Sequence, residues 1–186
     1  WFYTPYLMLG ESLYDAFIRA ARRGVDVRII MPGIPDKKTI YRISRSYYGA
    51  LMEAGVKIYE YKPGFVHEKA CIVDDRLAGI GTVNLDYRSL FLHYECYSLF
   101  YKADIIKDLK ADFEETQGKC HECVMEEQKK GMEAFLCKKY GAKKAKIEVC
   151  QDQALLGGFI LRVGSDEYDW SMKGRLNRLE QRLTWR

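Results

Sequence analysis

The chain has 186 residues, of which 48% are hydrophobic and 13% aromatic, and its formal net charge is +4. This length and apolar content suit one ordinary domain, or one domain with a small appendage. No run approaches the roughly eighteen consecutive apolar residues of a membrane-spanning helix, and no signal-peptide pattern opens the chain. Because the chain starts at Trp1 without a methionine, we expect it to be a fragment of a longer protein.

The charge is distributed unevenly. Residues 1–118 carry 16 basic and 16 acidic residues, whereas residues 119–186 carry 14 and 10. The basic surplus could favour an anionic lipid or an acidic partner. A surplus this small is more often ordinary solvated surface.

Strands and helices alternate in the first part of the chain. Apolar residues at helical spacing predict a helix over 11–23, with Gly24 as its stop. Strands predicted over 1–5 and 25–31 flank it, and a right-handed crossover would make them a parallel pair. A helix over 38–54 and a strand over 56–61 continue the pattern. That helix would carry Tyr41, Tyr47 and Tyr48. Aromatic residues of this kind more often form the buried stripe of a helix than lipid contacts.

Two apolar runs follow, separated by a polar turn. They predict a hairpin with strands over 68–73 and 77–83. A strand over 94–101 and an amphipathic helix over 104–115 complete this part. Beyond a linker at 118–124, the remaining elements that we predict are a helix over 124–140, strands over 143–150 and 155–163, and a helix over 171–183.

Polar side chains cluster around the predicted hairpin. Alternation along a strand puts His67 and Lys69 on one side, and Thr82 and Asn84 also share a side. An imidazole can attack phosphorus or protonate a leaving oxygen, while an ammonium and an amide can hold phosphate oxygens. Glu95 is a candidate for fixing the histidine tautomer. Spacing alone leaves open a half-buried hairpin with incidental polar residues.

The spacing of these residues is specific. His67-x-Lys69, four residues, Asp74, six residues and then Gly-Thr-Val-Asn at 81–84 resembles the full HKD signature of the phospholipase D superfamily. The following LDYRSLFLHYE resembles the bacterial cardiolipin synthase branch, and the resemblance covers residues 1–117. It implies an α/β fold, a mixed sheet flanked by helices. It also implies a phosphohistidine mechanism on phosphodiesters, without a cofactor or metal and without a nucleic-acid partner.

The resemblance also implies roles for single residues. Lys69, Asn84 and Thr82 would hold the substrate phosphate, and Glu95 would orient His67. Asp74 belongs to the signature as a catalytic candidate. It lies too far along the strand to face the histidine, so we expect it to cap the turn.

The superfamily builds one site from two HKD motifs, and this chain has one, because His93 and His121 lack the companion residues. The chain would therefore be half a site that needs a second HKD half or an identical chain. The implied reaction is phosphatidyl transfer to a glycerol-bearing phospholipid. The implied location is peripheral, at the cytoplasmic face of a bacterial inner membrane, with anionic phospholipid as substrate.

The cysteines offer a second candidate site. Two cysteines spaced as in Cys120-His121-Glu122-Cys123 are typical of zinc or redox sites. A structural zinc site also needs a second ligand pair, and none follows at a workable spacing. We therefore predict no metal site. Reduced thiols are the expectation for all the cysteines.

The tail from about residue 125 resembles a different family, the C-terminal region of the ATP synthase delta subunit. The residues that carry this resemblance are LLGGF at 155–159, RVG at 162–164 and DWSMKGRL at 169–176. We predict a phospholipase D-like domain at 1–117, a linker at 118–124 and a small α+β delta-like segment at 125–186. The alternative function is a non-catalytic peripheral-stalk module that binds ATP synthase subunits. A natural two-domain protein and a fused or chimeric chain both remain open.

Overall fold

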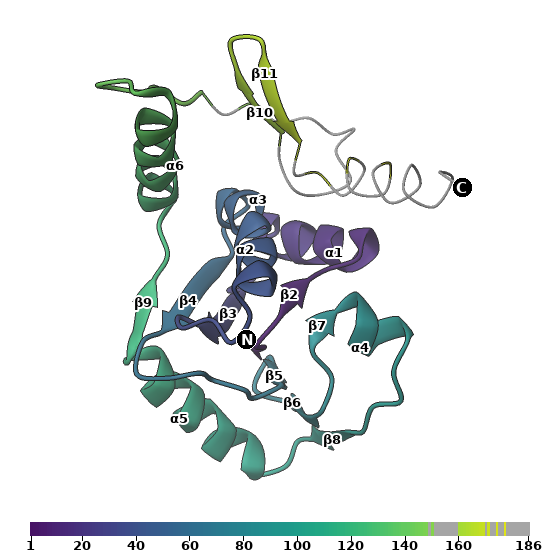
Figure 1. Cartoon of the computed structure of the whole chain (residues 1–186). Coiled ribbons are helices and arrows are strands. Elements are labelled where there is room, and N and C mark those ends of the chain that lie inside the picture. Colours follow the sequence, from purple (N-terminus) through teal and green to yellow (C-terminus); the bar gives the residue numbers. More distant parts are fainter. Residues whose placement is uncertain (149, 151–159, 170, 172–173, 175–176, 178–186) are drawn as a thin grey trace. The chain divides into compact units, whose positions relative to one another are not determined.

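The computed structural model describes residues 1–148, 150, 160–169, 171, 174 and 177 (Figure 1). The chain forms two compact units, Trp1–Lys130 and Gly131–Arg186. Among the described residues, no helix combines the length and the apolar character that spanning a membrane requires.

A seven-stranded mixed sheet forms the centre of the first unit. Three parallel strands are flanked on both sides by antiparallel ones. This is the mixed sheet that the sequence predicts. The strands in spatial order are β8 (Tyr97–Tyr101), β6 (Leu77–Gly81), β5 (Ala70–Val73), β1 (Phe2–Tyr3), β3 (Arg28–Pro32), β4 (Lys57–Tyr61) and β9 (Cys120–Glu122).

The parallel strands are joined by helical crossovers. Helix α1 (Glu11–Arg22) connects β1 to β3, and Phe2 pairs with Ile29. The helix predicted over 38–54 is present as two pieces, α2 (Lys38–Ser46) and α3 (Tyr48–Glu53). Tyr47 and Tyr48 at the junction are buried, as predicted for a core stripe, whereas Tyr41 is half-buried.

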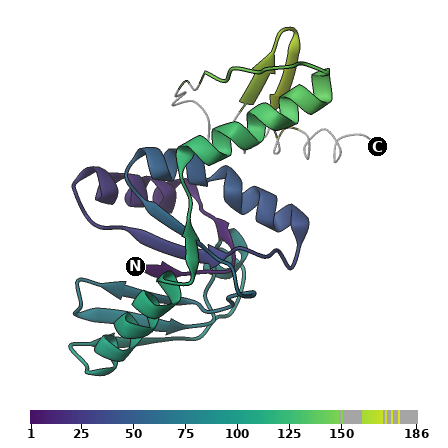
Figure 2. The ribbon, with the colours of Figure 1, turned by 90° about the vertical axis from the view of Figure 1, so that its left-hand side faces the viewer.

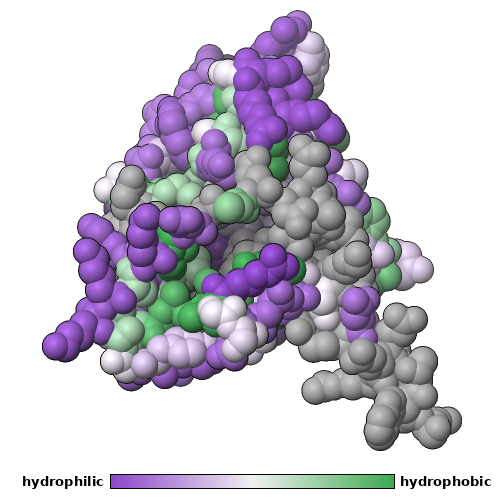
Figure 3. All heavy atoms as spheres, turned by 90° about the horizontal axis from the view of Figure 1, so that it is seen from above, coloured by the Kyte–Doolittle hydropathy of each residue, from purple (hydrophilic) through white to green (hydrophobic). Residues whose placement is uncertain are grey.

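Helices cover both faces of the sheet (Figures 1 and 2). Because side chains alternate along a strand, Ile29 and Met31 pack with α1 and α3 on one face, whereas Ile30 points to the other. That second face packs against helix α5 (Ile105–Gln117) through Phe113 and its neighbours. Hydrophilic side chains dominate the described surface in Figure 3, in keeping with an apolar core between the layers.

Three short elements next to the hairpin were not predicted. Strands β2 (Leu7–Met8) and β7 (Leu85–Asp86) form a parallel pair, and helix α4 (Tyr87–Phe91) follows at once. Elements this short have almost no periodicity, so only their tertiary partners reveal them.

Strand β9 lies within the segment predicted as a linker. It pairs with β4, and Glu60 lies opposite His121. Cys120 packs on the face that carries α5, whereas Cys123 belongs to the core of the opposite face. The two thiols of the CHEC sequence therefore point to different layers.

The second unit contains the end of helix α6 (Met125–Tyr140) and a hairpin of β10 (Ile160–Val163) and β11 (Asp166–Asp169). The Tyr140 hydroxyl donates to Asp166 Oδ2 at 2.8 Å, which ties the helix to the hairpin. The strand predicted over 143–150 is wrong for residues 143–148, which form no strand. A lone strand would leave its backbone groups unpaired. Residues 155–159 and most of the helix predicted over 171–183 lie outside the described residues.

Candidate active site

The β5–β6 hairpin brings the predicted polar residues to one end. His67 and Lys69 come just before β5, and Thr82 and Asn84 come just after β6. Lys69 and Thr82 therefore lie outside the strands that were predicted to include them. The Gly81 N–H donates to the Lys69 carbonyl at 3.1 Å, which places the two flanks side by side. This end also adjoins the carboxyl end of β1, because Tyr3 pairs with Ala70. Ligands of open α/β sheets bind beyond the carboxyl ends of parallel strands.

Lys69 is the buried member of this group. Only 8% of the residue is exposed, whereas His67 is exposed. The Lys69 Nζ lies 2.9 Å from His67 Nδ1 and donates to the His67 carbonyl at 2.5 Å. This contact occupies Nδ1, so Nε2 is the ring nitrogen that remains for a substrate.

The charges around His67 favour its neutral form. Loss of solvent around the ring and then the Lys69 charge lower the pKa of His67, while Asp36 opposes them. Burial likewise lowers the pKa of Lys69, and the Glu95 carboxylate opposes that change. Glu95 therefore acts on Lys69 across the site.

Glu95 joins the polar groups on the β6 side. It accepts a short hydrogen bond from the Thr82 hydroxyl, and its Oε1 lies 3.5 Å from His93 Nδ1. Hydrogen bonds from Thr82 and then from Ser89 lower the pKa of Glu95. The contacts of the described residues do not include one between Glu95 and His67, whose Nδ1 faces Lys69 instead. The orienting role expected of Glu95 stays a prediction.

Asn84 is half-buried and held by Ser89. Its Nδ2 donates to the Ser89 hydroxyl at 2.9 Å, and its Oδ1 is buried without a hydrogen-bond partner among the described residues. The next residue is also anchored, because the Leu85 N–H donates to the buried Thr4 hydroxyl at 3.0 Å. The backbone beside Asn84 is thus fixed to the end of β1.

The sequence analysis missed Ser89. It lies in α4, where its backbone N–H donates to Asp86 at 2.7 Å, so Asp86 is the helix N-cap. An Asp followed three residues later by a Ser was the available signal, but a five-residue helix was too short to predict.

Asp36 was not among the predicted site residues, but it influences His67 and is held by Tyr6. The Tyr6 hydroxyl donates to Asp36 Oδ2 at 2.6 Å, and burial together with Asp36 raises the pKa of Tyr6 to about 12. The Asp36 charge also reaches His67. Both residues lie in loops after parallel strands, beyond β1 and β3.

Asp74 lies at the opposite end of the hairpin. Asp74 and Asp75 both have positive φ, and the Arg76 N–H closes the turn on the Val73 carbonyl at 3.1 Å. Aspartate tolerates this left-handed conformation better than most residues. The strand β5 separates Asp74 from His67, so the structure does not bring Asp74 to the other predicted residues.

Among the described residues, no group of three or more histidine, cysteine, aspartate or glutamate side chains is arranged to hold a metal ion. The site described above consists of an imidazole, an ammonium, an amide, hydroxyls and the carboxylates of Glu95 and Asp36. These groups can bind an anion and exchange protons.

Comparison with known protein families gives two matches. Residues 1–117 match the family described as "Cardiolipin synthase, PLD-like domain". The chain belongs to this family. Residues 119–183 match a second family, "ATP synthase delta (OSCP) subunit". Both matches agree with the resemblances seen in the sequence.

Curated relatives of the PLD-like domain include cardiolipin synthases. The chain is 47% identical over 115 residues to "Cardiolipin synthase 2" of Bacillus anthracis, which covers 62% of this chain and 22% of the relative. It is 50% identical over 113 residues to "Cardiolipin synthase" of Geobacillus sp. (strain WCH70), a match that covers 61% of this chain and 22% of the relative. An "Uncharacterized protein" of Streptococcus mutans is 57% identical over 113 residues, which cover 61% of this chain and 24% of that protein. The chain thus spans about a quarter of these relatives or less.

Solved structures show the same fold for the PLD-like domain. A phospholipase D family member, Nuc from Salmonella typhimurium, matches with a TM-score of 0.57 and 16% identity, covering 66% of this chain and 79% of that one. The phosphatidylserine synthase of Haemophilus influenzae matches with a TM-score of 0.50 and 18% identity, covering 76% and 39%.

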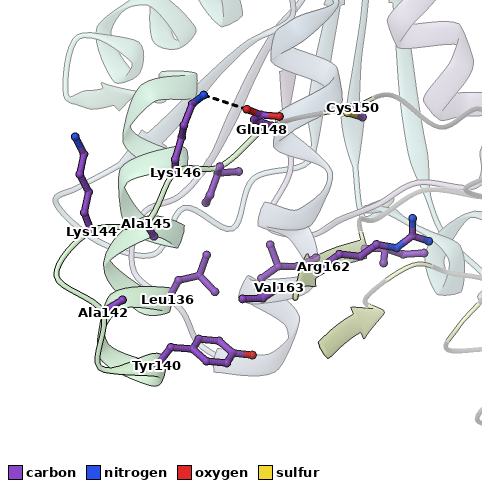
Figure 4. Close-up of a pocket in the computed structure, with 13 residues that line it drawn as sticks. Leu136, Tyr140, Ala142, Lys144, Ala145, Lys146, Glu148, Cys150, Arg162 and Val163 are labelled. Atoms are coloured by element: carbon purple, nitrogen blue, oxygen red, sulfur yellow. Dashed lines mark hydrogen bonds and ion pairs between the residues drawn. The ribbon is translucent and has the colours of Figure 1, made fainter. Parts of the chain in front are cut away.

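The second unit has an open pocket of about 820 Å³ (Figure 4). Leu136, Ile147 and Val163 contribute apolar surface, and the Lys146 ammonium lies 3.0 Å from Glu148 at its rim. The described lining residues include no histidine. The pocket therefore lacks the imidazole that distinguishes the PLD-like site.

Proposed function

We propose that residues 1–117 are the C-terminal HKD half of a cardiolipin synthase-like phosphatidyltransferase that works through a phosphohistidine. The observation that carries the proposal is the contact between the buried Lys69 ammonium and His67 at one end of the hairpin, next to Asn84. Together these groups suit a single anionic phosphorus centre. The rest of the predicted division, a linker at 118–124 and a delta-like segment at 125–186, belongs to the same proposal.

The chemistry needs two histidines. One attacks the phosphorus of a phosphatidyl donor, and the bond to the departing glycerol oxygen breaks as the other histidine protonates that oxygen. The hydroxyl of the acceptor lipid then gives its proton to the second histidine and attacks the phosphohistidine, which frees the first. His67 suits the acid–base role in a two-motif enzyme, because Lys69 holds Nδ1 and leaves Nε2 to exchange the proton.

Three other groups act on the phosphate in this proposal. Lys69 and the Asn84 amide stabilise the charge that builds on the non-bridging oxygens, and Thr82 borders the same position. Glu95 balances the Lys69 charge. No cofactor takes part, and the substrate is an anionic phospholipid reached from the cytoplasmic face of a bacterial inner membrane.

The stalk-module alternative is not favoured. The cardiolipin synthase relatives cover the N-terminal part of the chain, where the polar cluster lies. The delta-subunit match covers residues 119–183 and suggests ATP synthase partners only weakly.

The decisive experiment measures transfer between phosphatidylglycerol molecules in vesicles. The chain is assayed alone and with an equimolar amount of the part of the Bacillus anthracis relative that lies outside its match with this chain. We expect turnover in at least one arrangement, and we expect His67→Ala and Lys69→Ala to reduce it by at least about a hundredfold, the usual contribution of a positioned acid–base group.

His121→Ala is the matched control, because β9 lies at the other edge of the sheet from the hairpin. It should retain the parental rate. Turnover that persists in His67→Ala contradicts the proposal. So does the absence of turnover when the parent chain is assayed in both arrangements.

A further inference from the structure

Ser89 links two of the proposed site residues and has no role in the mechanism above. It is 6% exposed, and its backbone N–H is held at 2.7 Å by Asp86, which is itself 5% exposed. A buried residue whose backbone is held this firmly leaves its side chain few directions. It can therefore orient whatever it touches.

The Ser89 hydroxyl contacts the Asn84 amide, and it also influences Glu95. Asn84 Nδ2 lies 2.9 Å from the Ser89 Oγ, and the hydrogen bond from Ser89 is one of the causes that lower the pKa of Glu95. A hydroxyl has one proton to donate and two lone pairs to accept with. A carboxylate can only accept, so the single Ser89 proton goes to Glu95, and Ser89 must accept from the Asn84 amide.

This direction settles which end of the Asn84 amide faces Ser89. With the amide turned over, its oxygen would face lone pairs of the Ser89 oxygen, which is repulsive. The observed orientation leaves the second N–H of the Asn84 amide available to an anion.

We propose that Ser89 is a positioning residue. It holds one N–H of the Asn84 amide, while its own proton is directed to Glu95, and it thereby leaves the other N–H of Asn84 for the phosphate. The proposal rests on the function proposed for this site, because it presumes that Asn84 binds the phosphate. Ser89 itself does not touch the substrate.

The first test does not depend on turnover. NMR of the full chain follows the Asn84 side-chain N–H resonances and the titration of the Glu95 carboxyl in the parent, Ser89→Ala and Ser89→Thr. We expect Ser89→Ala to shift the Asn84 resonances and to raise the pKa of Glu95, because one donor is lost. Ser89→Thr, which keeps the hydroxyl, should restore both. Unchanged Asn84 resonances or an unchanged Glu95 titration in Ser89→Ala overturn the proposal.

Glu95→Leu keeps the question decidable if Ser89→Ala does not fold. Leucine has no acceptor for the Ser89 proton, so the Asn84 amide can turn over and its resonances should move. Resonances that stay in place in Glu95→Leu also overturn the proposal.

A second test uses the reconstituted transfer assay. Loss of one orienting hydrogen bond should lower the rate about fivefold to tenfold in Ser89→Ala. In an Asn84→Ala background the same change should have no further effect, because Ser89 acts through Asn84. Additive losses overturn the proposal, whereas an inactive parent with the NMR pattern intact counts against the proposed function alone.

Discussion

At the scale of single residues, the site depends on a buried cation beside an imidazole. Burying an ammonium costs free energy unless it is hydrogen-bonded, and Lys69 finds two hydrogen-bond partners on His67, the ring Nδ1 and the carbonyl. Loss of solvent around the ring and then the Lys69 charge lower the pKa of His67. Lys69 thus both contacts the ring and disfavours its charged form.

Lys69→Met tests this electrostatic link. Removing the charge while keeping most of the volume should raise the pKa of His67 toward its ordinary value of 6.5. NMR titration of the His67 ring measures it. Lys110→Met is the control, because Lys110 pairs with Asp75 at the far end of the hairpin. An unmoved His67 pKa in Lys69→Met contradicts the link.

The same shift predicts a pH dependence of stability. Between the lowered pKa of folded His67 and the ordinary value of 6.5, the unfolded chain binds more protons, so the free energy of unfolding rises with pH. The contribution is present above pH 6.5 and is lost as pH falls through the folded pKa. Urea unfolding measures the free energy of unfolding at both ends of this pH window. The decrease in that free energy from the upper to the lower pH should be smaller in Lys69→Met than in the parent.

At the scale of elements, the close approach of β6 and β8 fixes the β6 side of the site. A Cβ at Gly79 would overlap the Tyr97 ring, and one at Gly81 would overlap the Cys96 carbonyl. The Thr82 N–H donates to that same carbonyl at 2.9 Å. The glycines therefore let β8 come close enough to align Thr82 with Glu95.

Gly81→Ala should destabilise the fold by about 1–3 kcal/mol, the usual cost of overpacking, because a backbone carbonyl cannot move aside cheaply. Urea denaturation measures the loss. Gly49→Ala is the control: Gly49 lies in α3 with no atom within 4 Å of an added Cβ, so it should be neutral or stabilising by up to about 1 kcal/mol. Equal stability of Gly81→Ala and the parent contradicts the packing argument.

At the scale of the whole molecule, the chain has one HKD motif and spans about a quarter of its curated relatives or less. If two copies complete one site, the rate per parent chain must fall when an inactive copy is added. Mixing with His67→Ala should lower it about twofold at equal amounts and about fivefold at fourfold excess, by random pairing into symmetric dimers. A constant rate per parent chain excludes pairing of identical chains.

The sequence predicted much of this arrangement because local patterns are strong where elements are long. Helix α1, strand β4 and the hairpin follow from periodicity and turn residues. The wrong strand over 143–148 shows the limit, since alternation alone does not supply a pairing partner. Ser89 was missed because its role comes from contacts with Asn84 and Glu95, which are not its neighbours along the chain.

The order of residue types along the chain by itself determined the family, the mixed α/β fold and which polar residues flank the hairpin of β5 and β6, because spaced motifs and periodicity are properties of the chain. Only the tertiary structure decided how those groups pair: Nδ1 of His67 faces Lys69, Glu95 faces Thr82 and Ser89, and Asp74 lies at the far end of β5. The physical reason is that hydrogen-bond partners are chosen by distance and direction in space, which the approach of β8 to β6 and the capping of α4 set after the chain has folded.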